Sequence, residues 1–330
     1  MTPGPRLKEL ILEVTNACHH RCVHCSTRGG QPVPGELSHQ ERLRVLREAC
    51  DLELFELRLL GGDPLVRIEE TTELLTEANA RSVKKALVYT SAVEENPSWM
   101  AGLVSLQPIR VSAEASIYSA SAPTHDTITL KRGSFDRLLA NSRAARRIGF
   151  DLNWNFVWMK PNFDDLEPVL ALASQIGIAR VRVLRLMLNG RARDNQSSLE
   201  LTPEMASRCK QIISDLTRKF AMVELAHSKP LAFQLADAFH HESDCCSAGG
   251  AQLVVQADGV VFPCIGFKDS PALQVGNVRE HNLQDILLRS RSMPFRRVSD
   301  EFKECPAILF QKQPNLIQVS LMTKENRYGS

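Results

Sequence analysis

Three cysteines lie close together near the start of the chain, in the segment Cys-His-His-Arg-Cys-Val-His-Cys that ends at residue 25. They are Cys18, Cys22 and Cys25, and thiols at so short a spacing are typical of metal binding. Thiolates are the usual ligands of iron–sulfur clusters, and a 4Fe–4S cluster is normally held by four of them. The three thiols therefore predict a polynuclear centre in which one iron has no protein ligand.

An iron without a protein ligand can be chelated by the amino and carboxylate groups of a methionine moiety. S-adenosylmethionine (SAM) bound in this way has its sulfonium beside an electron donor. One low-potential electron then breaks the sulfur–C5′ bond and leaves a 5′-deoxyadenosyl radical, so we expect an external one-electron reductant, flavodoxin or ferredoxin. The alternative is a structural zinc held by the three thiols with His19, His20 or His24, because Cys₃His is a common tetrahedral set. We expect these histidines instead to be solvated loop residues.

Further motifs follow later apolar runs of the chain. Gly-Gly-Asp-Pro occupies residues 61–64, Ser112 lies in Arg-Val-Ser-Ala-Glu-Ala-Ser, and Arg185 lies in Val-Arg-Val-Leu-Arg-Leu. With the cysteine spacing, these motifs resemble the radical SAM superfamily, whose Gly-Gly-Glu-Pro turn presents backbone carbonyls to the SAM ammonium. The resemblance implies that Ser112 ends the fourth strand beside the SAM carboxylate or ribose, and that Arg185 reaches the same pocket. It implies that SAM is bound by the turn residues Gly61, Gly62, Asp63 and Pro64. Asp63 stands where the family has Glu, which leaves the backbone role intact.

Four more cysteines lie in the last third of the chain: Cys245, Cys246, Cys264 and Cys305. A β-hairpin is predicted between Cys246 and Cys264, with its turn at Gln-Ala-Asp-Gly. The segment resembles the auxiliary-cluster region, called twitch or SPASM, of many radical SAM enzymes, which implies a second 4Fe–4S cluster held by these cysteines. It departs from the family because Phe302, not cysteine, lies three residues before Cys305, so Cys245 is a candidate fourth ligand. Alternatively, the auxiliary cluster has an open iron, or one thiol of Cys245 and Cys246 is free and is a candidate hydrogen-atom donor in catalysis.

Short apolar runs alternate with longer amphipathic stretches over the first two hundred residues. The runs predict strands over 9–14, 55–62, 84–91, 109–116, 150–158 and 179–186. Helices are predicted between several of them, over 38–51, 68–80 and 134–149, the last with Ser134 as its N-cap. About six strand–helix units favour an α/β fold, a partial (β/α)6 TIM-type barrel with its functional loops at the carboxyl ends of the strands. The first cysteine group directly follows the first of these strands.

The pattern changes near residue 200, where a long helix over 202–220 precedes the hairpin. We therefore predict two domains, a radical SAM partial barrel over 1–200 and a twitch/SPASM-like auxiliary iron–sulfur domain over 201–330. The second is a smaller α+β domain built on the β-hairpin. Cys50 and Cys209 fall in helical segments, and we expect them to be small buried side chains.

The 330 residues carry a formal net charge of +2, and the charges are scattered along the chain. No block of Lys and Arg stands out, so neither a nucleic acid nor a membrane surface is expected as a partner. No signal peptide and no run of about 18 apolar residues is visible, which predicts a cytoplasmic protein. Nine cysteines in that reducing compartment favour metal binding over disulfides.

The radical abstracts a hydrogen atom from a substrate, and the outcome is dehydrogenation, epimerisation or bond formation. These outcomes share the same motifs, so the sequence does not choose among them. The first strand begins near residue 8, which leaves no room for the N-terminal leader-binding domain of many relatives that modify peptides. We therefore favour a small molecule, such as a sugar, aminocyclitol or nucleoside in a biosynthetic pathway, over maturation of a ribosomally made peptide. A zinc-stabilised interaction protein and a two-cluster electron carrier are the non-enzymatic alternatives.

Overall fold

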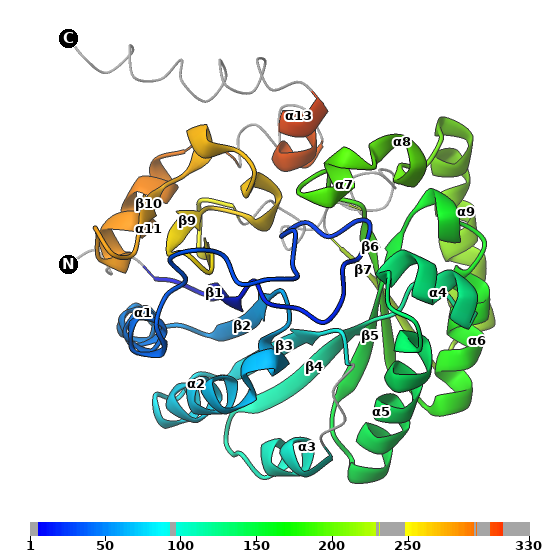
Figure 1. Cartoon of the computed structure of the whole chain (residues 1–330), viewed down its shortest axis with the longest axis horizontal. Helices are drawn as coiled ribbons and strands as arrows, with labels where there is room; N and C mark the ends of the chain where they lie inside the picture. The colour runs from blue at the N-terminus through cyan, green and yellow to red at the C-terminus, as the bar shows by residue number, and fades with distance from the viewer. Residues whose placement is uncertain are drawn as a thin grey trace.

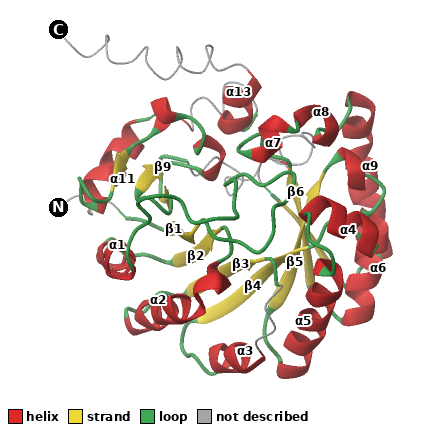
Figure 2. Cartoon of the chain, in the orientation of Figure 1, coloured by secondary structure: helices red, strands yellow, loops and turns green. Residues whose placement is uncertain are grey.

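The structure is a computed structural model that describes residues 6–92, 97–228, 231, 248–293, 295 and 304–312. Within these residues, ten strands form one sheet in the order β10-β9-β8-β1-β2-β3-β4-β5-β6-β7, and helices surround it (Figures 1 and 2). The strands are β1 (Glu9–Thr15), β2 (Glu56–Gly61), β3 (Lys85–Thr90), β4 (Arg110–Ser116), β5 (Leu152–Trp158), β6 (Arg180–Arg185), β7 (Glu224–His227), β8 (Gln252–Val255), β9 (Val260–Phe262) and β10 (Gly276–Asn277). The helices are α1 (His39–Asp51), α2 (Ile68–Ala80), α3 (Pro97–Val104), α4 (Ala122–Thr129), α5 (Ser134–Ile148), α6 (Leu166–Ile176), α7 (Arg191–Asp194), α8 (Gln196–Leu199), α9 (Pro203–Lys219), α11 (Leu283–Ser292) and α13 (Pro306–Lys312).

The strands β1 to β7 pair in parallel, each with the next along the chain. Leu10 and Leu12 of β1 pack in the core under the helices, while Ile11 packs on the other face with the hairpin strands. Parallel strands buried on both faces have nearly continuous apolar sequences, which is why six of them were predicted. β7 was not predicted. β7 and β10 form the two ends of the sheet, so the barrel is open and the predicted fold class is confirmed.

Two helices begin in different ways. α1 begins with a capping box, in which Ser38 and Glu41 each accept a hydrogen bond from the other's backbone N–H. α5 has Gly133 as its N-cap, in the left-handed conformation with φ 77°, and Ser134 is its first helical residue. The Ser134 hydroxyl donates to the Asp126 carboxylate at 2.8 Å, so the prediction of Ser134 as the N-cap was wrong.

The predicted hairpin is formed by β8 and β9, which pair antiparallel. β8 also pairs in parallel with β1, so the hairpin extends the barrel sheet and β1 lies between β2 and β8 (Figure 1). Glu13 of β1 forms an ion pair with Lys268, and their side chains are only 4% and 1% exposed. The hairpin and the barrel therefore share one sheet, and the segment after the hairpin is joined to β1 by a buried ion pair. The domain boundary near residue 200 stays a prediction.

Cys209 is fully buried in the core under the helices, and the half-buried Cys50 packs against the same core. Both side chains therefore contribute to packing, and the expected burial is confirmed for Cys209, whereas Cys50 is only partly buried. Among the described residues, no helix combines the length and the apolar character needed to cross a membrane.

Candidate iron–sulfur and SAM site

The cysteine loop, residues 16–38, leaves the carboxyl end of β1 and leads to α1 (Figure 1). Its backbone folds back on itself, because Cys18 N–H donates to Gly30 O at 3.0 Å and Gly30 N–H donates to Asn16 O at 2.9 Å. Cys25 N–H donates to Cys22 O at 3.2 Å. The three cysteines therefore lie on one hydrogen-bonded loop at the end of the first strand, where the sequence placed them.

Two of the three thiols accept backbone hydrogen bonds. His20 N–H donates to the Cys18 sulfur at 3.3 Å, and Gly29 N–H donates to the Cys25 sulfur at 3.2 Å. Burial raises the pKa of Cys18 to about 12, and it also raises the pKa of Cys22. Buried thiols of this kind become thiolates when a metal replaces the proton, and hydrogen bonds to the sulfurs then tune the cluster. The donor set therefore fits an iron–sulfur cluster.

The histidines of the loop differ from the expectation. His20 and His24 are only 4% and 9% exposed, so the prediction that they are solvated was wrong for both, while His19 is exposed. His24 packs edge-on against Tyr118, with 4.6 Å between the ring centroids. Burial lowers the pKa of His24 to about 3 and that of His20 to about 4, so both rings are neutral. Among the residues that the structure describes, no three His, Cys, Asp or Glu side chains form a group suited to a single metal ion.

The Gly-Gly-Asp-Pro turn packs directly on the cysteine loop. Gly62 N–H donates to Thr15 O at 2.7 Å, and Asp63 N–H donates to Ala17 O at 2.8 Å. A Cβ atom on Gly62 would lie 2.2 Å from Ala17 O, and one on Gly61 would lie 2.2 Å from Thr15 O. Because no side chain fits there, only glycine allows the two segments to lie this close. The glycines therefore hold the predicted SAM-binding turn against the predicted cluster loop.

Asp63 is 3% exposed, and both of its carboxylate oxygens accept hydrogen bonds from the protein. One oxygen accepts from Leu65 N–H at 3.0 Å. The other accepts from the Thr90 hydroxyl at 3.0 Å and from both the backbone N–H (2.9 Å) and the hydroxyl of Ser91. The carboxylate thus ties the turn, and the one-turn helix Pro64–Arg67 that follows it, to the end of β3. This is a positioning role, and direct contact of Asp63 or Pro64 with SAM stays a prediction.

Arg191, the first residue of α7, was missed in the sequence analysis. Its guanidinium donates to Cys22 O at 2.8 Å and to Gly29 O at 2.9 Å, and its backbone N–H donates to Cys25 O at 2.9 Å. Gly190 permits this approach, because a Cβ there would lie 2.5 Å from Cys25 O. The positive charge of Arg191 opposes the effect of burial on the pKa of Cys22. Arg191 therefore holds the loop and favours its thiolate form, and the one sequence signal for it is Asn-Gly-Arg soon after the sixth strand.

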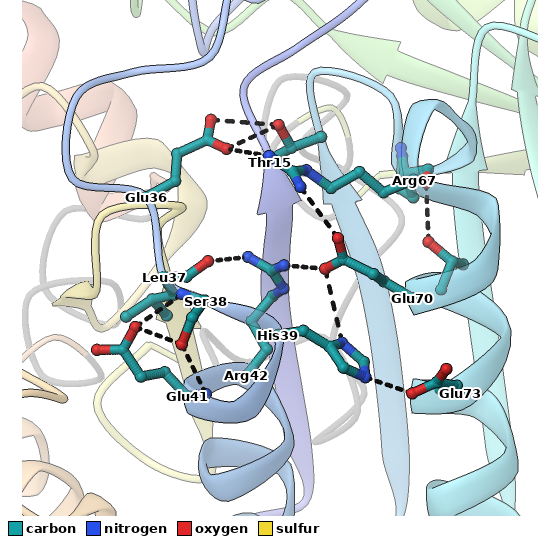
Figure 3. Close-up of polar contacts among 12 residues, drawn as sticks. Thr15, Glu36, Leu37, Ser38, His39, Glu41, Arg42, Arg67, Glu70 and Glu73 are labelled. Carbon is teal, nitrogen blue, oxygen red and sulfur yellow. Dashed lines mark hydrogen bonds and ion pairs between the residues drawn. The ribbon is translucent and has the colours of Figure 1, made fainter.

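A polar network holds the base of the loop to the surrounding helices (Figure 3). Glu36, whose side chain is 8% exposed, accepts a hydrogen bond from the Thr15 hydroxyl at 2.9 Å. Arg67 bridges Glu36 at 3.3 Å and Glu70 at 3.0 Å. Glu70 in turn pairs with the buried guanidinium of Arg42 from α1. The end of β1 is therefore fixed to α1 and α2 through a continuous chain of charges, which the sequence alone did not indicate.

Ser112 and Arg185 were the other predicted SAM-binding residues. Ser112 is the third residue of β4, which pairs with β3 as far as Ala115 and ends at Ser116. The prediction that Ser112 ends the strand was therefore wrong, because the whole segment is held in the sheet. Arg185 does end β6, and its guanidinium pairs with Glu304 at 3.2 Å, next to Cys305. Contact of Ser112 or Arg185 with SAM stays a prediction.

The described residues do not include two members of the second cysteine group, Cys245 and Cys246. Cys264 immediately precedes a short helix (Ile265–Phe267), and its sulfur accepts a hydrogen bond from Gly266 N–H at 3.4 Å. Cys305 is 7% exposed and immediately precedes α13. A Cβ on Gly266 would lie 2.4 Å from the Cβ of Ala307, so the turn after Cys264 packs on the start of α13. The two cysteine-bearing segments are therefore neighbours, and a shared cluster stays a prediction.

The comparisons with known proteins agree with this arrangement. Residues 12–173 match the model of the radical SAM superfamily, and residues 245–307 match that of SPASM, an iron–sulfur cluster-binding domain. The chain is 26% identical to a PqqA peptide cyclase from Rhizobium meliloti (strain 1021) over 298 residues, which are 89% of this chain and 77% of that protein. SuiB of Streptococcus suis bound to S-adenosylmethionine has a TM-score of 0.73 at 18% identity, over 93% of this chain and 75% of SuiB. For anSMEcpe with bound AdoMet the TM-score is 0.70 at 16% identity, over 91% and 88% of the two chains.

An open α/β barrel with three cysteines on the loop after its first strand defines a class of enzyme that cleaves SAM reductively. The chain belongs to the radical SAM superfamily and carries a SPASM-type C-terminal domain. This membership implies SAM, a SAM-binding 4Fe–4S cluster and further iron–sulfur in the SPASM domain.

Proposed function

We propose that the chain modifies a ribosomally made peptide through radical SAM chemistry, by epimerisation or crosslinking. The observation that carries the proposal is the similarity to a PqqA peptide cyclase over 89% of this chain. Two of the similar folds are also known with peptides, SuiB bound to its precursor peptide SuiA and anSMEcpe bound to the Cp18Cys peptide. These relatives favour the peptide over the small molecule that the sequence analysis preferred.

Cys18, Cys22 and Cys25 would hold the SAM-binding cluster, and the Gly-Gly-Asp-Pro turn would bind the SAM. When bound, the cluster supplies one electron to the SAM sulfonium, which yields a 5′-deoxyadenosyl radical. The chain's own contribution is to hold these two segments in contact, through the glycines of the turn and through Arg191. Cys22 also packs against an apolar cluster that contains Tyr118, and this cluster limits the access of water to the loop.

The second cysteine group would supply the ligands of an auxiliary cluster. Cys264 and Cys305 would contribute from neighbouring segments, with Cys245 or Cys246 completing the set, and the remaining thiol of that pair is the candidate hydrogen-atom donor. The electron would come from flavodoxin or ferredoxin in the cytoplasm. Arg185 would act at this second group, because its ion pair with Glu304 holds the residue next to Cys305.

The test is SAM cleavage by anaerobically reconstituted protein. With dithionite as the reductant, the wild-type chain should release 5′-deoxyadenosine, and Cys22→Ala should release none because the cluster loses a ligand. Cys50→Ala is the matched control, since Cys50 only packs against the core, and it should keep full activity. A Cys22→Ala protein with wild-type turnover would overturn the assignment of the site.

The substrate class is tested with short peptides encoded near the gene, incubated in heavy water. A peptide substrate should increase 5′-deoxyadenosine release and should itself change in mass. Deuterium uptake without other change indicates epimerisation through an exchangeable thiol, whereas loss of two hydrogens indicates crosslinking. Stimulation by sugars or nucleosides and by no peptide would contradict the peptide proposal while leaving the radical SAM assignment intact.

A further inference from the structure

Positively charged side chains are concentrated on the solvent-facing side of α5 and on the turn before it. The small net charge of the whole chain does not reveal this concentration. We call it the α5 basic face, and it consists of Lys131, Arg132, Arg137, Arg143, Arg146 and Arg147. Asp136 is the one exposed acidic residue between the first and last of these positions. The expectation that no Lys/Arg block stands out therefore fails here.

These cations also differ from two exposed arginines elsewhere in the chain that form ion pairs. Arg47 pairs with Glu77 at 2.8 Å, and Arg279 pairs with Glu41 at 2.6 Å. Within the described part of the chain, no carboxylate forms an ion pair with any residue of the α5 basic face. An unneutralised group of like charges raises the local potential and attracts an oppositely charged partner.

The α5 basic face begins two residues after α4, and the end of α4 is hydrogen-bonded to the cysteine loop. At the end of α4, Ile128 O accepts from Val23 N–H at 2.9 Å and Thr129 O accepts from Arg21 N–H at 3.1 Å. These two hydrogen bonds flank Cys22, whose side chain packs against the apolar cluster that contains Ile128. Leu130, the next residue, is 59% exposed and adjoins the first cation of the face. A protein seated on Leu130 and Lys131 would therefore lie beside the end of α4, whose carbonyl groups accept hydrogen bonds from the residues on either side of Cys22.

We propose that Leu130 and the α5 basic face form the docking surface for an acidic one-electron donor protein of the flavodoxin class. This inference rests on the proposed function, because a radical SAM enzyme needs an electron at its cysteine loop. An exposed apolar residue beside complementary charges suits a transient interface, in which charge guides the encounter. A nucleic acid would also be attracted to a basic face, but the position next to Cys22 favours a redox protein. α4 and α5 follow one another along one side of the barrel (Figure 1).

The test compares two charge reversals that change the net charge equally. Arg132→Glu alters the α5 basic face, and Arg289→Glu alters an exposed arginine of α11 in the C-terminal part of the chain. Calorimetric titration of each protein with flavodoxin measures the affinity directly. Arg132→Glu should weaken binding about three- to tenfold, as expected for loss of exposed charge attraction, while Arg289→Glu should not. Raising the salt from about 0.05 to about 0.5 M should weaken wild-type binding more than that of Arg132→Glu.

A SAM-cleavage assay distinguishes failure of this inference from failure of the proposed function. Arg132→Glu should release 5′-deoxyadenosine at the wild-type rate with dithionite and more slowly with limiting reduced flavodoxin. Equal flavodoxin binding by the two variants would overturn the docking surface. Loss of the dithionite-driven rate in Arg132→Glu would also overturn it, because the surface would then serve the substrate or the fold. Weaker binding of a short DNA duplex, with unchanged flavodoxin binding, would instead assign the face to nucleic acid. Absence of SAM cleavage in the wild-type protein with dithionite would refute the proposed function itself.

Discussion

The replacement Arg191→Ala tests how the cysteine loop is held before any cluster is present. The substitution removes two hydrogen bonds from the guanidinium, to Cys22 O at 2.8 Å and to Gly29 O at 2.9 Å. It leaves the backbone hydrogen bond from residue 191 to Cys25 O in place, so the loop stays attached at one point. The expected effect is therefore a local opening of the loop and not unfolding of the barrel.

The magnitude follows from the two carbonyls that lose a charged donor. A hydrogen bond to a charged group contributes about 1.5–3 kcal/mol, so we expect the free energy of loop opening to fall by about 3 kcal/mol or more. Each 1.36 kcal/mol is a factor of ten, which gives about a hundredfold faster amide exchange in peptides that cover residues 18–30. Hydrogen exchange followed by mass spectrometry on the metal-free chain measures this change. Arg191→Lys should recover part of the protection, because an ammonium can reach one of the carbonyls.

Arg193→Ala is the matched control on the same short helix. Its exposed side chain donates to Leu188 O at 3.1 Å, and among the described residues it donates to none in the cysteine loop. Exchange in the loop should therefore match the wild type in this variant. If Arg191→Ala also exchanged at the wild-type rate, the reasoning that the guanidinium holds the loop would be refuted.

Two predictions concern buried charges in the barrel. Burial raises the pKa of Glu114 from its usual 4.5, so the folded chain holds this proton to higher pH than the unfolded chain, and stability is lost as pH rises through that window. Glu114→Gln removes the ionisable group, and its melting temperature should lie about 2–4 °C above that of the wild type at pH near 8. Scanning calorimetry should show a smaller difference near pH 5. An equal difference at both pH values would contradict a raised pKa of Glu114. Lys268→Met should lower the free energy of unfolding by about 3–5 kcal/mol, because it leaves Glu13 charged and buried. The double variant Glu13→Leu/Lys268→Met should regain most of this in urea titrations, and failure to regain it would show that the loss comes from packing.

The sequence predicted correctly those features that depend on a single strand or a single loop. The strand Glu9–Thr15 is buried on nearly its whole length, and its boundaries differ from the predicted 9–14 by a single residue. The position of Cys18, Cys22 and Cys25 followed from that strand, because the carboxyl end of a barrel strand leads into a functional loop. β7 escaped prediction because its four residues are only partly buried and carry little apolar pattern.

Features that depend on contacts between distant segments were not accessible from the sequence. Ser134 lost its predicted capping role because its hydroxyl is used by Asp126 of the preceding helix. His24 packs against Tyr118, which lies two residues after the end of β4. Arg191 reaches Gly29 across 162 positions of the chain, and no local pattern marks such a contact.

The central position of β1 has a consequence for how this architecture can be altered. The barrel and the hairpin are parts of one sheet, because β1 pairs with β2 on one edge and with β8 on the other. A truncated protein that ends near residue 200 would leave a row of unpaired N–H and C=O groups along its first strand, ready to recruit another chain. Chimaeras that exchange the C-terminal half between relatives will therefore succeed only when the incoming hairpin reproduces the register from Glu9 opposite Gln252 to Leu12 opposite Val255.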